Sequence, residues 1–177
     1  MTSSPSTLKI ALAQFNCVVG DIEGNGARII AAHAQAQSLQ ADLIVFPELF
    51  LTGYPPEDLV LKPAFQKATQ EALHKLARCL PSSPAILVGT IWPDKGSLFN
   101  AVAHLEKGEI RAIRSKVELP NYGVFDELRV FSPGPLPSPI VVNGVRIGVP
   151  ICEDIWKDQV VECLSECGAE ILIALNG

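Results

Sequence analysis

The sequence has no long apolar run, no secretion signal and no cluster of basic residues. No stretch approaches the length that a helix needs to cross a bilayer. The first residues lack the basic patch and apolar core of a signal peptide. The net charge is −5, and the Lys and Arg residues are dispersed, which argues against general nucleic-acid binding. We therefore expect a cytoplasmic protein that binds neither a membrane nor nucleic acid.

Paired cysteine motifs are also missing. The sequence has five cysteines, an odd number, and none of them forms a CxxC pair. A disulfide framework is typical of secreted chains, so reduced thiols in the cytoplasm fit this pattern better. No set of Cys and His residues has the spacing of a complete metal site, and we expect no metal. The cysteines are Cys17, Cys79, Cys152, Cys163 and Cys167.

The composition is that of a globular domain. The chain has 177 residues, of which 48% are hydrophobic and 19% charged, and one domain is the default expectation. Apolar runs typical of buried strands alternate with helix-like segments, and a hairpin interrupts them. This alternation predicts a layered α/β protein with a mixed sheet. The expected strands are 8–15, 43–46, 85–92, 99–105, 109–115, 141–149 and 171–175, and the expected helices are 27–40, 63–80 and 156–167.

Three irregular segments separate these elements. Residues 20–26 form a glycine-rich turn, from which Asn25 is expected to cap the first helix. Residues 51–59 are too rich in Pro and Gly for a regular element. Residues 117–139 make a connection much longer than usual, and long loops in compact domains are commonly functional.

Cys152 occupies a position that suits a nucleophile. It lies between the apolar run 141–149 and the helix expected over 156–167. A corner of this kind exposes the sulfur, and the N–H groups at the start of a helix can stabilise a developing oxyanion. The alternative is a structural role, because free cysteine is one of the residues most often buried.

Glu48 and Lys116 also stand where apolar strands end. Ligands of open α/β sheets bind at the carboxyl ends of strands, so the two side chains would meet Cys152 if the three strands were parallel neighbours. A carboxylate can then take the thiol proton, and a lysine can stabilise the oxyanion, as acyl transfer through a thioester requires. Alternatively, Glu48 caps a turn and Lys116 is an ordinary solvated charge.

Five motifs in order carry a resemblance that covers about residues 8–177. Phe46-Pro47-Glu48-Leu49, Lys116 with Leu119, and Pro150-Ile151-Cys152-Glu153-Asp154 resemble the three motifs of the nitrilase superfamily. Residues 51–59 and 116–131 are similar to the glutaminase domains of bacterial glutamine-dependent NAD synthetases.

The resemblance implies an α-β-β-α sandwich and hydrolysis of glutamine. Cys152 would be the nucleophile and form a γ-glutamyl thioester, Glu48 the general base, and Lys116 a group that stabilises the oxyanion. This step needs no cofactor. Tyr122 would bind glutamine, and Phe125 and Glu153 would shape the pocket or hold the polar end of the substrate. The alternative for the two aromatic residues is loop packing, and for Glu127 and Arg129 it is a local ion pair.

The length of the chain differs from the family pattern, because a nitrilase-type domain normally continues past this point. We expect residues 1–7 to be a flexible leader and residues 8–177 to be the N-terminal part of a glutaminase domain, apparently truncated at its C-terminal side. The last strand would then leave an exposed apolar edge, so the chain alone is expected to be poorly soluble or inactive. The Ser-Gly-Gly phosphate loop of the synthetase domain is absent.

In the full-length enzyme, the resemblance implies that ammonia passes to a synthetase domain of the same polypeptide. That domain would use ATP and Mg to amidate deamido-NAD to NAD, in a homo-oligomer. Two alternatives remain open. One is a free-standing nitrilase-type amidase acting on another small amide, and the other is a non-catalytic assembly module with the same fold.

Overall fold

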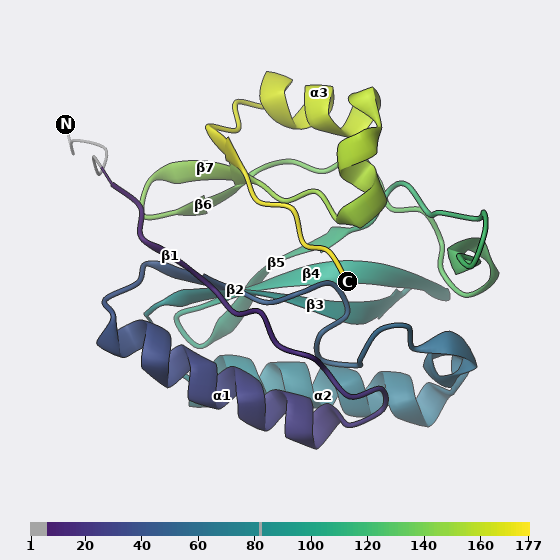
Figure 1. Ribbon diagram of the computed structural model, residues 1–177, viewed down its shortest axis with the longest axis horizontal. Helices are drawn as coiled ribbons and strands as arrows, with labels where there is room; N and C mark the ends of the chain where they lie inside the picture. The colour runs from purple at the N-terminus through teal and green to yellow at the C-terminus, as the bar shows by residue number, and fades with distance from the viewer. Residues whose placement is uncertain (1–6, 82) are drawn as a thin grey trace.

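Two β-sheets face each other in the computed structural model, and helices cover the outer face of each (Figure 1). The structure describes residues 7–81 and 83–177. The predicted α-β-β-α sandwich with mixed sheets is confirmed. The predicted leader 1–7 lies outside the described residues, except for its last residue. None of the described helices is both long and apolar enough to span a bilayer.

The first sheet has five strands in the order β1-β2-β3-β4-β5. The first three strands are parallel, and the last three form an antiparallel meander. Because the meander reverses direction twice, β5 runs parallel to β2. The predicted hairpin with its turn at Lys107-Gly108 is confirmed. The strands are β1 (Ile10–Leu12), β2 (Leu43–Val45), β3 (Ala85–Asp94), β4 (Ser97–Glu106) and β5 (Glu109–Ser115).

The second sheet contains β6 (Ile140–Val142), β7 (Val145–Gly148) and β8 (Ile171–Leu172), with β8 at one edge. The prediction of a single strand over 141–149 is wrong. The run is a hairpin that turns at Asn143 and Gly144, whose φ angles are 49° and 85°. An Asn-Gly pair suits a two-residue turn with positive φ at both positions, and the surrounding Val and Ile residues concealed this signal.

Helices α1 (Ile22–Ser38) and α2 (Pro63–Cys79) cover the first sheet, and α3 (Asp158–Glu166) covers the second (Figure 1). Two short 3-10 helices lie in the connections, η1 (Glu57–Leu61) and η2 (Glu127–Arg129), and a third, η3 (Cys152–Trp156), precedes α3. The predicted 63–80 helix is confirmed. The predicted start of the first helix is wrong, because α1 begins within the glycine-rich segment.

The residue that caps α1 is Asp21, not Asn25. The carboxylate of Asp21 accepts a hydrogen bond from the N–H of Gly24 at 2.8 Å, which satisfies one of the free N–H groups of the first turn. Asn25 is buried inside the helix, where its side chain exchanges two hydrogen bonds with the backbone of Val18. Two glycines within the first five residues of α1 lower the helix propensity, so the sequence indicated a loop there.

The core has two layers that share the first sheet. On β2, Ile44 faces α1 and α2, while Leu43 and Val45 face the second sheet. This double burial explains why the strand is apolar throughout. Burying each such side chain contributes roughly 1.5–3 kcal/mol. The packed layers hold the strand ends, where the polar residues lie, in fixed positions.

Candidate active site

The side chains of Glu48, Lys116 and Cys152 converge between the two sheets. The condition considered for their meeting, three neighbouring parallel strands, is not the arrangement found. Glu48 follows β2 and Lys116 follows β5, but β3 and β4 lie between these strands. Cys152 follows β7 of the other sheet. The sandwich therefore brings the residues together, with two from one sheet and one from the opposite sheet.

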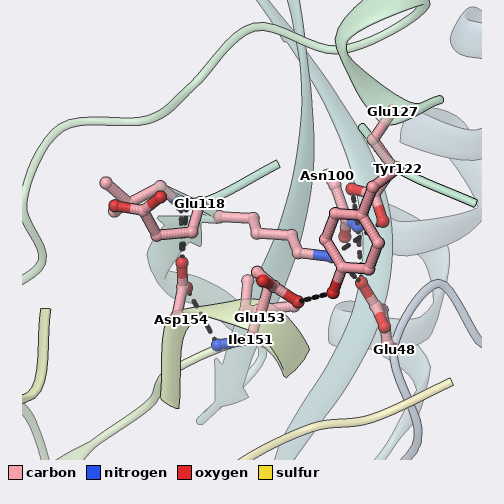
Figure 2. A network of polar contacts seen from close by, with 10 residues as sticks. Glu48, Asn100, Glu118, Tyr122, Glu127, Ile151, Glu153 and Asp154 are labelled. Carbon is pink, nitrogen blue, oxygen red and sulfur yellow. Dashed lines mark hydrogen bonds and ion pairs between the residues drawn. The ribbon is translucent and has the colours of Figure 1, made fainter. Parts of the chain in front are cut away.

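Lys116 lies at the centre of a buried polar network, whose members Glu48, Asn100 and Glu127 lie close together in Figure 2. Its Nζ donates to Oε1 of Glu48 at 2.7 Å and to Oε1 of Glu127 at 2.8 Å. The Nδ2 of Asn100 donates to the same Glu48 oxygen at 2.8 Å and to Oε2 of Glu127 at 3.4 Å. Glu48 and Lys116 are both fully buried. The network therefore holds one buried ammonium between two carboxylates.

The charges of this network depend on one another. Burial alone would lower the pKa of Lys116, but the carboxylates of Glu48 and Glu127 outweigh burial and raise it. Burial raises the pKa of Glu127, while the Lys116 ammonium opposes this effect. Lys116 thus stays protonated near neutral pH. Two of its three N–H groups serve the carboxylates, which leaves one for another acceptor.

The thiol of Cys152 is protonated near neutral pH. Burial, followed by the negative charge of Glu48, raises its pKa from 9.0 to about 11, and the charge of Lys116 opposes the rise. A nucleophilic thiol here needs a base at the moment of attack. Oε2 of Glu48 is buried and has no hydrogen-bond partner among residues 7–81 and 83–177. That oxygen is available to accept the proton.

The backbone around Cys152 is unusual. Its φ is +47°, in the left-handed region that residues other than glycine rarely adopt. Cys152 is the first residue of η3, so its own N–H and that of Glu153 have no acceptor within that helix. The segment after β8 bonds both sides of the site. The N–H of Cys152 donates to the carbonyl of Leu175 at 2.9 Å, and the N–H of Glu48 donates to the carbonyl of Asn176 at 3.1 Å.

A glycine on β3 lets the Glu48 turn approach the sheet. A Cβ atom at Gly89 would lie 2.3 Å from both the nitrogen of Leu49 and the carbonyl oxygen of Pro47. No side chain fits at that distance. The N–H of Leu51 also donates to the carbonyl of Gly89 at 3.0 Å. The packing of this turn against bare backbone therefore determines where the Glu48 carboxylate lies.

The residues predicted to bind substrate also lie together. The hydroxyl of Tyr122 donates to Oε2 of Glu153 at 2.9 Å, as Figure 2 shows. The rings of Tyr122 and Phe125 meet edge to face, with their centroids 5.8 Å apart. Tyr122 remains 58% exposed, so its ring is open to a ligand. A cavity of about 370 Å³ lies beside Phe125 and Glu127, and Tyr54 also lines it.

The sequence interpretation missed four residues of this site. Glu127, Asn100 and Asp154 are buried polar residues, and Tyr54 has a pKa that burial, with Glu48 and Glu127, raises to about 12. A polar residue within the apolar stretch 98–103 was a signal for Asn100. Glu127 lies in an irregular loop and carries no such pattern.

The alternative of a local ion pair between Glu127 and Arg129 is wrong. Glu127 faces inward and binds Lys116. The guanidinium of Arg129 binds Asp126 at 2.7 Å, together with Asp58 and Glu57 of η1. Residues two apart in a 3-10 turn point in different directions, so one faces the site and the other faces solvent.

Similarity to known proteins covers almost the whole chain. The family model described as carbon-nitrogen hydrolase matches residues 9–177. The glutamine-dependent NAD(+) synthetase of Rhodobacter capsulatus is 40% identical over 169 residues, which are 96% of this chain and 31% of that protein. The synthetase of the same name from Thermotoga maritima is 44% identical over 151 residues, 85% of this chain and 26% of that protein. The chain thus spans about a third of the length of these relatives.

Solved structures show the same similarity. A glutamine-dependent NAD+ synthetase from Acinetobacter baumannii, in complex with ADP, superposes with a TM-score of 0.91 at 37% identity, over 96% of this chain and 32% of that one. An amidase from Nesterenkonia sp. superposes with a TM-score of 0.78 at 26% identity, over 96% of this chain and 64% of that one. A mutant of the Nesterenkonia sp. AN1 amidase shows the result of Michael addition of acrylamide at its active site cysteine.

Proposed function

The chain belongs to the carbon-nitrogen hydrolase family. We propose that it hydrolyses the side-chain amide of glutamine through a thioester on Cys152. The observation that carries the proposal is the position of the Cys152 thiol beside the buried Glu48–Lys116 pair. The names of the relatives support glutamine as the substrate. The active site cysteine of the Nesterenkonia amidase supports a thiol nucleophile.

In the first half of the reaction, Glu48 takes the proton of the Cys152 thiol as the sulfur attacks the amide carbon. The negative charge that develops on the amide oxygen is stabilised by the remaining N–H of Lys116 and the backbone N–H of Glu153. The C–N bond then breaks, and the leaving nitrogen takes the proton from Glu48. Ammonia leaves, and a γ-glutamyl thioester remains on Cys152.

In the second half, Glu48 takes a proton from water as the water oxygen attacks the thioester carbon. The C–S bond breaks, glutamate is released, and the proton returns to the sulfur. Glu48 thus acts as base twice and returns to its starting state each time. Lys116 stays charged throughout, because its carboxylate partners raise its pKa. This half-reaction uses the same oxyanion donors.

Substrate selection is assigned to the surface around Tyr122. Free glutamine carries an α-ammonium group, for which the Glu153 carboxylate is a suitable partner. The Tyr122 hydroxyl orients that carboxylate through the 2.9 Å hydrogen bond. Phe125 packs against the Tyr122 ring and lines the adjacent cavity, which suits the methylene groups of the substrate.

In the full-length protein, the released ammonia would supply a synthetase domain that amidates deamido-NAD to NAD. That domain would require ATP and Mg, whereas the glutaminase step uses side chains alone. The relatives about three times as long as this chain support this role. We also propose a homo-oligomer located in the cytoplasm.

Replacement of Cys152 in the full-length protein tests the proposal. Cys152→Ala should abolish NAD formation with glutamine as nitrogen donor and preserve NAD formation with free ammonia. Cys163→Ala is the matched control, because Cys163 is also a free, half-buried thiol but lies on α3. It should preserve both activities. Loss of both activities in Cys152→Ala would contradict the assigned role.

The similarity to the Nesterenkonia amidase favours one second candidate, an amidase acting on another small amide. A comparison of kcat/KM for glutamine, asparagine and simple aliphatic amides separates the two. Glutamine should be the preferred substrate, and a preference for an uncharged aliphatic amide would favour the second candidate. A non-catalytic module has no physical reason to bury an ammonium and two carboxylates beside a thiol.

A further inference from the structure

Asp154 is a buried carboxylate that the proposed reaction does not use. It is 1% exposed, and its negative charge faces three backbone N–H groups rather than a cationic side chain. Oδ1 accepts from Val117 at 3.0 Å and from Glu118 at 2.8 Å. Oδ2 accepts from Ile151 at 3.0 Å. Three donors compensate for the loss of hydration, although burial still raises the pKa of Asp154.

The bonds from Val117 and Glu118 cross between the two sheets next to the site, whereas the bond from Ile151 stays within the turn of Asp154. Figure 2 shows Asp154 bonded to both sides. Val117 directly follows Lys116, at the end of β5 in the first sheet. Ile151 directly precedes Cys152, beyond β7 in the second sheet. No strand pairing connects the two sheets among residues 7–81 and 83–177. A single carboxylate therefore ties the backbone beside Lys116 to the backbone beside Cys152.

The same carboxylate closes the turn that contains Cys152. The N–H of Asp154 donates to the carbonyl of Ile151 at 3.0 Å, and the N–H of Ile151 donates back to the carboxylate. Cys152 lies between them with its left-handed φ of +47°. A local turn needs only this reciprocal pair. The bonds to Val117 and Glu118, 37 and 36 positions away along the chain, have no role in the turn itself.

We propose that Asp154 is a positioning residue that fixes the Cys152 turn against the end of β5, and so sets where the thiol lies relative to Lys116 and Glu48. Its effect on turnover rests on the proposed function, but its effect on the thiol does not. A side chain that merely stabilised the fold would alter the melting temperature and leave the folded site unchanged.

Asp154→Asn in the full-length protein tests this role. The side chain of Asn has one acceptor oxygen. It can accept hydrogen bonds from the N–H groups of Val117 and Glu118, or from the N–H of Ile151, but not from both sides of the contact. The matched control is Asp42→Asn. Asp42, located before β2, also accepts a backbone N–H, from Lys9 at 2.7 Å, and it also binds the second sheet, through Asn143 at 2.8 Å. It lies at the opposite end of β2 from Glu48.

For the folded Asp154→Asn protein, we expect kcat for glutamine to fall about 10- to 100-fold, as displacement of a reacting group by about 1 Å does, with a much smaller change in KM. Asp42→Asn should keep the wild-type kcat. Folded protein is quantified by circular dichroism, so that loss of structure does not appear as loss of rate. Wild-type kcat in folded Asp154→Asn would overturn the proposal.

Alkylation of Cys152 by iodoacetamide gives a readout that does not require glutamine. Peptide mass spectrometry separates Cys152 from the other four thiols. Burial, Glu48 and Glu127 raise the pKa of this thiol, while Lys116 lowers it. The pH at which the alkylation rate reaches half of its maximum, the midpoint, should therefore shift toward the ordinary value of 9.0 when the thiol is displaced. An unchanged midpoint in Asp154→Asn overturns the proposal even if the protein has no glutaminase activity.

A second variant covers the case in which Asp154→Asn does not fold. Asp154→Glu keeps the charge and both acceptor oxygens and moves them by one methylene group. Its folded form should show the same loss of kcat and the same shifted midpoint. Inactivity of the wild-type protein toward glutamine, together with a shifted midpoint in either variant, would contradict the proposed function and support the positioning role.

Discussion

Nζ of Lys116 lies 2.7 Å from Oε1 of Glu48, although the two residues follow strands that are separated by two others in the sheet. The contact exists because the β3-β4-β5 meander returns β5 parallel to β2, so both strands end on the same side. Lys116 then extends across the strand ends to a carboxylate that is itself fully buried. The pair is therefore a product of topology and not of sequence proximity.

Removal of the ammonium should affect both stability and turnover. Lys116→Met keeps most of the apolar length of the side chain but leaves Glu48 and Glu127 buried with no cation. Breaking a buried pair from one side costs about 3–5 kcal/mol of unfolding free energy, and loss of an oxyanion donor lowers kcat by about 100-fold or more. Chemical denaturation and glutamine turnover measure the two effects.

Lys67→Met is the matched control for this variant. Lys67 lies on α2, 78% exposed, and pairs with Glu71 at 3.8 Å. An exposed pair of this kind contributes at most about 1 kcal/mol. Equal losses of stability in the two variants would contradict the buried, central position of Lys116.

Alkylation of the wild-type protein should report a protonated thiol at neutral pH. Burial and the Glu48 charge raise the pKa of Cys152 to about 11, so its alkylation should increase with pH to a midpoint near 11 instead of near 9.0. The unfolded chain in urea supplies the ordinary midpoint. Since a raised thiol pKa means that the folded state retains the proton longer, the unfolding free energy should also decrease as pH rises from 9.0 to about 11.

Glu48→Gln separates the causes of this shift. The variant removes a negative charge beside the thiol, so the midpoint should move downward while glutamine turnover falls. A wild-type midpoint below pH 8 would instead indicate a preformed thiolate paired with Lys116. That result would rule out Glu48 as the base that activates the thiol.

Gly89→Ala should displace the Glu48 turn. The added Cβ would lie 2.3 Å from backbone atoms of Pro47 and Leu49, which cannot yield as a flexible side chain can. We expect a loss of about 1–3 kcal/mol in unfolding free energy, as for other overpacking changes, together with reduced turnover. Thermal denaturation and kcat measure these effects.

Gly26→Ala makes the same chemical change but should increase the unfolding free energy instead of decreasing it. A Cβ at this position on α1 meets nothing within 4 Å. Ala is the better helix former, so stability should rise by about 0.5–1 kcal/mol, with turnover unchanged. A greater loss of stability in Gly26→Ala than in Gly89→Ala would contradict the described packing.

Local patterns in the sequence were enough to predict most of the secondary structure. Residues close in the chain specify the apolar stripe of α2, the apolar run of β3 and the hairpin at Lys107-Gly108. The Asn143-Gly144 turn was also visible, but the β-branched residues around it suggested one strand. The capping role of Asp21 was missed because two glycines follow it within the first five residues of α1.

The site was harder to predict, because its contacts join distant residues. The order of the strands decides that Glu48 and Lys116 meet, and the sequence carries no local sign of that order. Asn100 and Glu127 bind this pair from β4 and from the long loop, 52 and 11 positions away along the chain from their partners. The motif resemblance identified Glu48, Lys116 and Cys152 as candidates, while their geometry came only from the structure.

The most direct test of the central claim is acid quenching of the full-length protein during glutamine turnover, followed by mass spectrometry of the peptide that contains Cys152. We predict a γ-glutamyl group on Cys152, present after milliseconds to seconds and lost as glutamine is consumed. Cys163 should remain unmodified in the same sample. Sustained release of ammonia from glutamine by a Cys152→Ala protein, or a γ-glutamyl group on another residue, would contradict the account.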